Sequence, residues 1–160
     1  MKALTGVVIL FVAILTYWVY QQEKAIETLK AEIAEKKKDR SLFEYQERCA
    51  EAARKSYSDM GFKNKEWAAF ENHYNEKLNR CFIEITDVET NGGRIVTSKS
   101  IFDAVEGKQY GEYIWQSDKV KKYWEVPPIL CDVISPSGEK TLCKSDDEYK
   151  ELLKPYMDIS

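Results

Sequence analysis

The sequence has little of what enzymes and metal-binding proteins commonly use. Its 160 residues include one histidine and four cysteines, and no two cysteines are spaced C-x2-C as in many zinc sites. No glycine-rich phosphate loop is present. A net charge of −3 also leaves the chain without the basic excess by which proteins bind nucleic acids. We therefore expect no metal site, no cofactor and no nucleic-acid partner.

A catalytic group is equally hard to find. The single histidine, His73, lies close in sequence to Glu71, Asn75 and Glu76, and such a group can supply a general base. No serine or cysteine nucleophile motif lies beside it, so we interpret His73 as a surface or hydrogen-bonding residue. We predict that the protein is not an enzyme. The alternative is a small exported hydrolase or inhibitor-like domain, with His73 and the nearby carboxylates in a cleft.

Charge is absent from one long stretch at the start of the chain. Residues 3–20 form a run of 18 residues without a charged side chain. As a helix this run extends roughly 27 Å, close to the ~30 Å of a bilayer's hydrocarbon core. It ends in Tyr17, Trp18 and Tyr20, bulky rings that favour the membrane–water boundary and stand where a cleavage site needs small residues. The sequence predicts a transmembrane signal-anchor at residues 1–20, with a cleaved signal peptide as the alternative.

The orientation of such an anchor is read from the lysines and arginines at its two ends. Lys2 and the α-amino group precede the run, and Lys24 and Lys30 follow it, so the two ends balance. The basic residues between 36 and 40 favour a domain in the cytoplasm. The four cysteines favour an oxidising compartment instead. We predict a single-pass protein of the cell inner membrane whose domain faces the periplasm. The alternative is a cytoplasmic regulatory domain with free thiols.

Residues 21–40 contain no glycine or proline and are rich in strong helix formers. Ile26, Leu29 and Ile33 recur at spacings of three and four residues, which makes a narrow apolar seam typical of a short coiled coil. The sequence predicts a juxtamembrane helix and a possible homodimer through these three residues. Packing of the seam against the protein's own domain and a solvated spacer helix are the alternatives.

Residues 41–160 are long enough for one compact domain. Helical periodicity covers residues 41–60, and an N-cap with acidic residues opens a last helix near residue 145. Alternating or β-branched stretches and turn signals lie between them, with no clear assignment for residues 66–75. The predicted fold class is therefore α+β: an antiparallel β-meander of about five strands, flanked by helices. The predicted strands lie near residues 81–88, 94–102, 113–115, 129–134 and 140–143.

The four cysteines of an exported domain predict two disulfides. Cys131 and Cys143 are equally distant from Ser137, the centre of a Pro-Ser-Gly turn. A hairpin with this turn places the two cysteines opposite each other, at ~4.5–5.5 Å between Cα atoms, and a disulfide needs ~4.4–6.8 Å. The remaining pair, Cys49 and Cys81, would then join the helix to the first strand.

Aromatic residues cluster in one part of the domain. A sheet strand would place Tyr113 and Trp115 on one face, with several lysines close by in the sequence. Such rings can form a binding surface for a glycan or an envelope protein, or they can fill the core of a small sheet. The predicted binding surface consists of Tyr110, Tyr113, Trp115, Tyr123 and Trp124.

Several segments resemble those of a group of uncharacterised small bacterial exported or membrane-anchored proteins. The segment HYNEKLNRCF at residues 73–82 carries the resemblance, together with YGEYIW at 110–115, KKYWEVPP at 121–128 and CKSDDEY at 143–149. The likeness extends over most of residues 45–157. It implies a protein of the bacterial envelope, and it brings no activity or site residues. The function expected from the sequence is a membrane-anchored extracytoplasmic domain that binds a partner.

Overall fold

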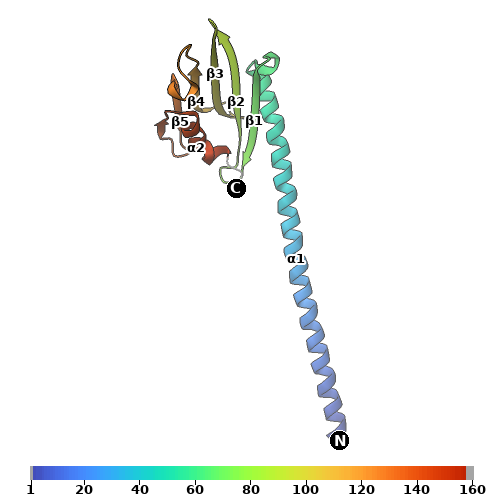
Figure 1. The fold of residues 1–160 in the computed structure, drawn as a ribbon. Helices are drawn as coiled ribbons and strands as arrows, with labels where there is room; N and C mark the ends of the chain where they lie inside the picture. The colour runs from blue at the N-terminus through green and yellow to red at the C-terminus, as the bar shows by residue number, and fades with distance from the viewer. Residues whose placement is uncertain (1, 158–160) are drawn as a thin grey trace. The chain divides into compact units, whose positions relative to one another are not determined.

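The computed structural model describes the backbone of residues 2–157 and the side chains of residues 17–157. The chain divides into two compact units, Met1–Glu44 and Tyr45–Ser160. Helix α1 spans Lys2–Asp59 and belongs to both (Figure 1). The helical segments predicted at 21–40 and 41–60 are therefore parts of one continuous helix. This helix contains no proline, which would interrupt it. It ends at Asp59, two residues before Gly61, and glycine commonly follows the end of a helix.

The predicted transmembrane anchor at residues 1–20 is contradicted. Among the residues that the structure describes, no helix is both long and apolar enough to cross a bilayer. The apolar run continues without a break into the charged segment 21–40 of the same helix, and the side chains of residues 1–16, which hold most of the run, lie outside the described residues. The inner-membrane location and the membrane as a partner depended on this anchor and are withdrawn with it.

The unit Tyr45–Ser160 contains a six-stranded antiparallel sheet in which each strand pairs with the next along the chain (Figure 1). Two short 3-10 helices, η1 (Phe62–Asn64) and η2 (Tyr123–Glu125), lie in connecting segments, and helix α2 (Asp146–Met157) follows the last strand. The strands are β1 (Ala68–Asn75), β2 (Arg80–Asn91), β3 (Arg94–Asp103), β4 (Gln109–Gln116), β5 (Leu130–Ile134) and β6 (Lys140–Leu142).

The prediction of about five strands is wrong, because it omits β1. This strand pairs with β2 along its whole length, from Ala68 opposite Asp87 to Asn75 opposite Arg80. Its sequence, AAFENHYN, contains no β-branched residue, and only Phe70 and Tyr74 favour a strand, so the local signal is weak. As an edge strand it has one neighbour, and that neighbour supplies its hydrogen bonds.

The two faces of the sheet pack against different helices. Alternation along β2 directs Phe82 to one face and Ile83 to the other. The face with Phe82 packs against α2, whose Tyr149 and Tyr156 are buried there. The face with Ile83 packs against residues of α1 that belong to the same unit, among them Ala53. The sheet is thus covered on both sides within the unit Tyr45–Ser160.

Both expected disulfides are present in the structure. Cys49 in α1 is bonded to Cys81 at the start of β2, with 5.2 Å between their Cα atoms. Cys131 in β5 is bonded to Cys143, just beyond β6, with 5.0 Å between Cα atoms. The pairing of β5 with β6 has the register expected from the turn, since Val133 lies opposite Thr141. One bond joins a helix to the sheet, and the other closes the last hairpin.

Candidate functional site

A cavity of about 440 Å³ lies between β4, the segment around η2 and the first turn of α2. We call it the aromatic groove. Tyr113 and Trp115, both buried residues of β4, form its floor. Tyr123 and Trp124 belong to one wall, which continues through residues 125–128, and residues 144–147 form the opposite wall. The volume falls within the range of small-ligand and peptide sites.

The floor of the aromatic groove is joined to its wall by a hydrogen bond and a ring contact. The indole Nε1 of Trp115 donates a hydrogen bond of 3.0 Å to the carbonyl oxygen of Val126, which ties β4 to the wall. The ring of Trp115 lies 4.7 Å from that of Tyr123, measured between centroids. Burial raises the pKa of Tyr113, and a hydrogen bond with Tyr123 adds to this effect. Tyr113 therefore stays neutral at physiological pH.

The wall at η2 exposes two large rings. Trp124 is 75% exposed and Tyr123 about half exposed, although burying such rings is usually favourable. A hydrogen bond across this short helix keeps it in place, since the backbone nitrogen of Lys122 donates to Glu125 Oε2 at 2.9 Å. The ammonium group of Lys122 lies 5.1 Å from the centroid of the Trp124 ring and occupies one of its faces. The structure thus holds two aromatic rings in solvent at the rim of a cavity.

The opposite wall is the capped N-terminus of α2. Ser145 Oγ accepts a hydrogen bond of 3.1 Å from Glu148 N, as an N-cap residue does. Burial by itself would raise the pKa of Asp146, but hydrogen bonds from Lys150 and Lys99 outweigh burial and hold that pKa below its usual range. Asp147 is exposed and has no ion pair among the described residues. It is the carboxylate of this wall that is available to a ligand.

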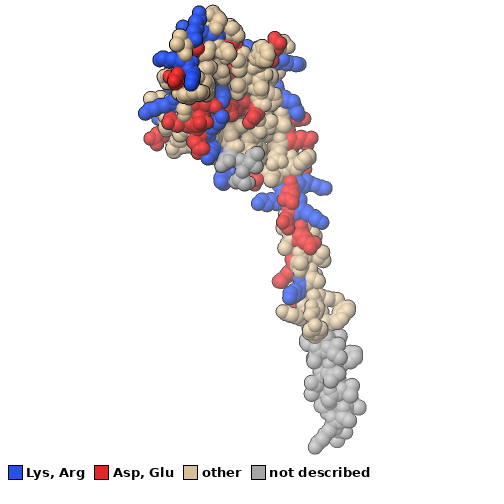
Figure 2. All heavy atoms as spheres, viewed as in Figure 1, with Lys and Arg blue, Asp and Glu red and all other residues tan. Residues whose placement is uncertain are grey.

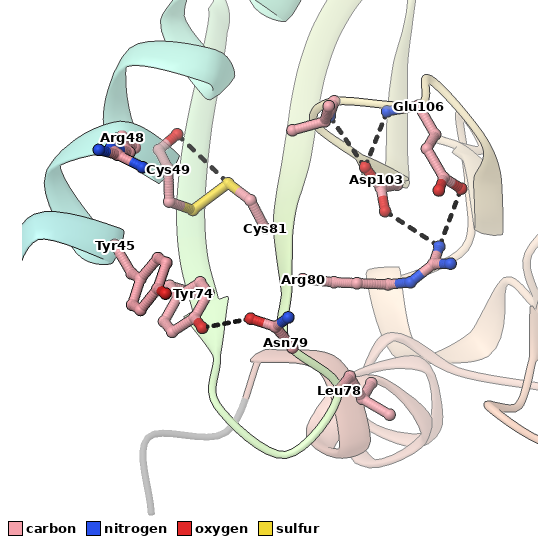
Figure 3. Close-up of a pocket in the computed structure, with 11 residues that line it drawn as sticks. Tyr45, Arg48, Cys49, Tyr74, Leu78, Asn79, Arg80, Cys81, Asp103 and Glu106 are labelled. Carbon is pink, nitrogen blue, oxygen red and sulfur yellow. Dashed lines mark hydrogen bonds and ion pairs between the residues drawn. A yellow bond between two sulfur atoms is a disulfide. The ribbon is translucent and has the colours of Figure 1, made fainter. Parts of the chain in front are cut away.

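A second cavity, of about 540 Å³, lies beside the Cys49–Cys81 disulfide (Figure 3). Its central cation, Arg80, is already engaged: Nη1 donates to Asp103 Oδ2 at 3.2 Å and to Glu106 Oε2 at 2.9 Å. Asp103 Oδ1 in turn accepts from the backbone nitrogen of Glu106 at 2.8 Å. These bonds close the turn between β3 and β4, so we assign Arg80 and Asp103 a structural role.

The remaining side chains of this second cavity also bond to one another. The rings of Tyr45 and Tyr74 stack with 5.2 Å between centroids, and Tyr74 OH donates to Asn79 Oδ1 at 2.7 Å (Figure 3). Within the described part of the chain, Arg48 is the one charged residue of this cavity that has no partner. Most polar groups of this cavity are therefore bonded to one another, and Arg48 is the charged group that remains for a ligand.

The five aromatic residues of the predicted binding surface do not all line the same cavity. Tyr113, Trp115, Tyr123 and Trp124 line the aromatic groove. Tyr110 lies in the core instead, where its ring contacts Tyr156 at 5.1 Å and its hydroxyl accepts a hydrogen bond from Arg80. A glycine and a β-bulge separate Tyr110 from the regular register of β4.

Sequence reasoning missed the second wall of the groove and the prolines of the first. The N-cap motif at residues 145–148 was recognised as a helix start, but its position opposite the rings depends on the tertiary fold. The proline pair, Pro127 and Pro128, follows Trp124 after only two residues, and this closeness is a signal that could have pointed to the site.

Comparison with models of known protein families, with curated proteins and with solved structures found no match. The resemblance to bacterial envelope proteins therefore stays a prediction. The function has to be argued from the site itself.

His73 lies on β1, half-buried and opposite Phe82. Within the described residues it has no hydrogen-bonded partner. Glu71 occupies the same face of β1 two residues away and lies opposite Glu84. No hydrogen bond joins His73 to Glu71 or Glu76, so the described residues do not form the acid–base pair that the hydrolase alternative requires.

Proposed function

We propose that the unit Tyr45–Ser160 is a binding domain that holds an extended segment of a partner protein in the aromatic groove. The observation that carries this proposal is the exposure of Trp124 at the rim of a cavity whose floor is Trp115. Tryptophan and tyrosine are the residues that most often dominate binding energy at protein interfaces. Rings held in solvent by a fixed backbone lose little further entropy when a partner covers them.

A peptide fits this groove better than a glycan does. Extended segments, especially those in the polyproline II conformation, dock between aromatic side chains in several families of recognition domains. The rim offers charges of both signs, Lys144 and Asp147, which can pair with polar groups of a peptide. A glycan binds mainly by stacking on aromatic faces, and because Lys122 lies over one face of Trp124, a sugar ring would have to use the other. Glycan binding is therefore the competing outcome of the test.

The proposal is tested by selecting peptides from a random display library on the immobilised full chain. Trp124→Ala removes the exposed ring of the groove. Trp67→Ala is the matched control, because the Trp67 side chain is similarly exposed, at 69%, and does not line the aromatic groove. Truncation of a tryptophan anchor typically costs at least ~2 kcal/mol, which is a loss of roughly 30-fold in affinity.

We expect the selected peptides to bind the wild-type chain and Trp67→Ala equally, and Trp124→Ala at least roughly 30-fold more weakly. Equal binding to all three would contradict the proposal. Failure to enrich any peptide, together with Trp124-dependent binding on a glycan array, would replace the peptide by a carbohydrate ligand.

A further inference from the structure

Residues 17–44 are the part of the unit Met1–Glu44 whose side chains the structure describes, and three aliphatic side chains of this helical part have no cover within it. Ile26, Leu29 and Ile33 are each half or more exposed. Figure 2 shows side chains of both charges along this part of α1, interleaved with uncharged ones. Apolar residues in a stripe that has no partner within its own unit indicate an interface.

The residue types on this stripe select a particular kind of partner. In heptad notation Ile26 and Ile33 occupy successive a positions and Leu29 the d position between them, and Val19 extends the a positions upstream. β-Branched residues at a combined with leucine at d favour two parallel strands. The same stripe on a second copy satisfies this geometry without any further change.

The charges beside the stripe agree with a parallel arrangement. Glu32 holds the g position and Lys37 the e position of the next heptad, and these two positions meet between chains of a parallel coiled coil. Neither side chain has an ion-pair partner within the described part of its own chain. A symmetric pair of chains therefore gains two Glu32–Lys37 contacts.

We propose that the chain forms a parallel, in-register homodimer through Val19, Ile26, Leu29 and Ile33. Lys36, which falls on the next d position, ends the apolar contact because two lysines would face each other there. A dimer carries two aromatic grooves. If the proposed function holds, a partner with two recognition segments would bind both and gain avidity.

Cysteine crosslinking of the full chain in a non-ionic detergent tests the geometry. Ile33→Cys places a thiol on the stripe, and Ala31→Cys, at the outward f position, is the matched control. In the parallel dimer the two thiols introduced at position 33 are adjacent. In an antiparallel pair with Ile26 opposite Leu29, residue 33 lies about 11 residues from its copy, or roughly 16 Å along the axis.

We expect a mild oxidant to convert most of the Ile33→Cys chain to a covalent dimer and little of the Ala31→Cys chain. Equal crosslinking at both positions would mean non-specific association, for example through residues 3–16, and would overturn the proposal. No crosslinking at residue 33 would do the same.

A charge exchange tests the proposal without altering the stripe. Glu32→Lys alone sets lysine against Lys37 in both contacts, and we expect it to weaken the dimer on the order of tenfold in sedimentation equilibrium at low salt. The double variant Glu32→Lys/Lys37→Glu restores opposite charges and should recover the wild-type affinity. If the double variant is as weak as the single one, the parallel register is wrong. None of these measurements depends on the aromatic groove.

Discussion

Replacing Tyr149 with phenylalanine should stabilise this protein, although most changes in a core do the opposite. Tyr149 is fully buried in α2, and its hydroxyl has no hydrogen-bond partner among the residues that the structure describes. Its ring packs 5.6 Å from that of Tyr113. Tyr149→Phe keeps this ring contact and removes only the unpaired hydroxyl.

The matched variant lies two turns further along the same helix. Tyr156 is 1% exposed, so its burial equals that of Tyr149, but its hydroxyl donates a hydrogen bond to the carbonyl oxygen of Ile134 in β5. A buried polar group without a partner costs roughly 1–3 kcal/mol. Tyr149→Phe should therefore raise the free energy of unfolding by about 1 kcal/mol, and Tyr156→Phe should lower it by about 1 kcal/mol.

Urea unfolding followed by tryptophan fluorescence, with both disulfides intact, measures the difference. The free energies of unfolding of the two variants should change in opposite directions relative to the wild type. In thermal unfolding, each change of about 1 kcal/mol would correspond to roughly 4 °C in Tm. A loss of stability in Tyr149→Phe equal to that in Tyr156→Phe would refute the reasoning. It would mean that the Tyr149 hydroxyl is hydrogen-bonded in solution and that the packing of α2 differs from the structure.

Two other perturbations follow from the sheet. Burial raises the pKa of Glu84 above its usual value, so its ionisation opposes folding as pH rises from about 4.3 through the folded pKa. Glu84→Gln should raise the free energy of unfolding at pH 7, and this increase should disappear below about pH 4. An equal increase in the free energy of unfolding at both pH values would show that the ionisation of Glu84 is not its cause. Removing the Cys131–Cys143 bond should cost about 3 kcal/mol, and removing the Cys49–Cys81 bond about 4 kcal/mol, because they close loops with sequence separations of 12 and 32. Thermal unfolding of the double-alanine variants that reverses this order would contradict the loop-closure argument.

The parts of the fold that were predictable are those with local signals. The Gly92–Gly93 pair adopts positive φ at both positions and closes the turn between β2 and β3, as a primed turn requires. The pairing of Cys131 with Cys143 followed from their spacing around a turn. Each of these features depends on residues close together in sequence, so tertiary context was not needed.

Features that depend on distant residues were not predictable. Strand β1 exists because β2 pairs with it, and its end is fixed by Asn75, whose Nδ2 donates to the carbonyl oxygen of Pro155 at 2.9 Å. That contact spans 80 residues. The aromatic groove likewise combines β4 with the start of α2, so the sequence predicted four of its rings but not the wall opposite them. Tyr110 was misplaced because it lies at the other end of β4, where its ring packs against Tyr156 of α2 and not in the groove.

The apolar run at residues 3–20 led to the wrong prediction of a transmembrane anchor. Hydropathy and length within this window match a membrane span, but no helix among the described residues is long and apolar enough to cross a bilayer. The run and the charged segment 21–40 belong to one helix, as expected for a helix that continues past residue 20. The same continuity places Ile26, Leu29 and Ile33 on one uninterrupted helix, which is what a coiled coil requires.

The central claim is that a partner peptide binds in the aromatic groove, and the indole N–H resonances of the chain test it most directly. The four tryptophans are Trp18, Trp67, Trp115 and Trp124, and each gives one signal in a ¹H–¹⁵N spectrum. Titration with a peptide selected on the full chain should shift the signals of Trp115 and Trp124 and leave those of Trp18 and Trp67 unchanged. Shifts confined to Trp67 or Trp18, with the two groove signals unmoved, would contradict the account.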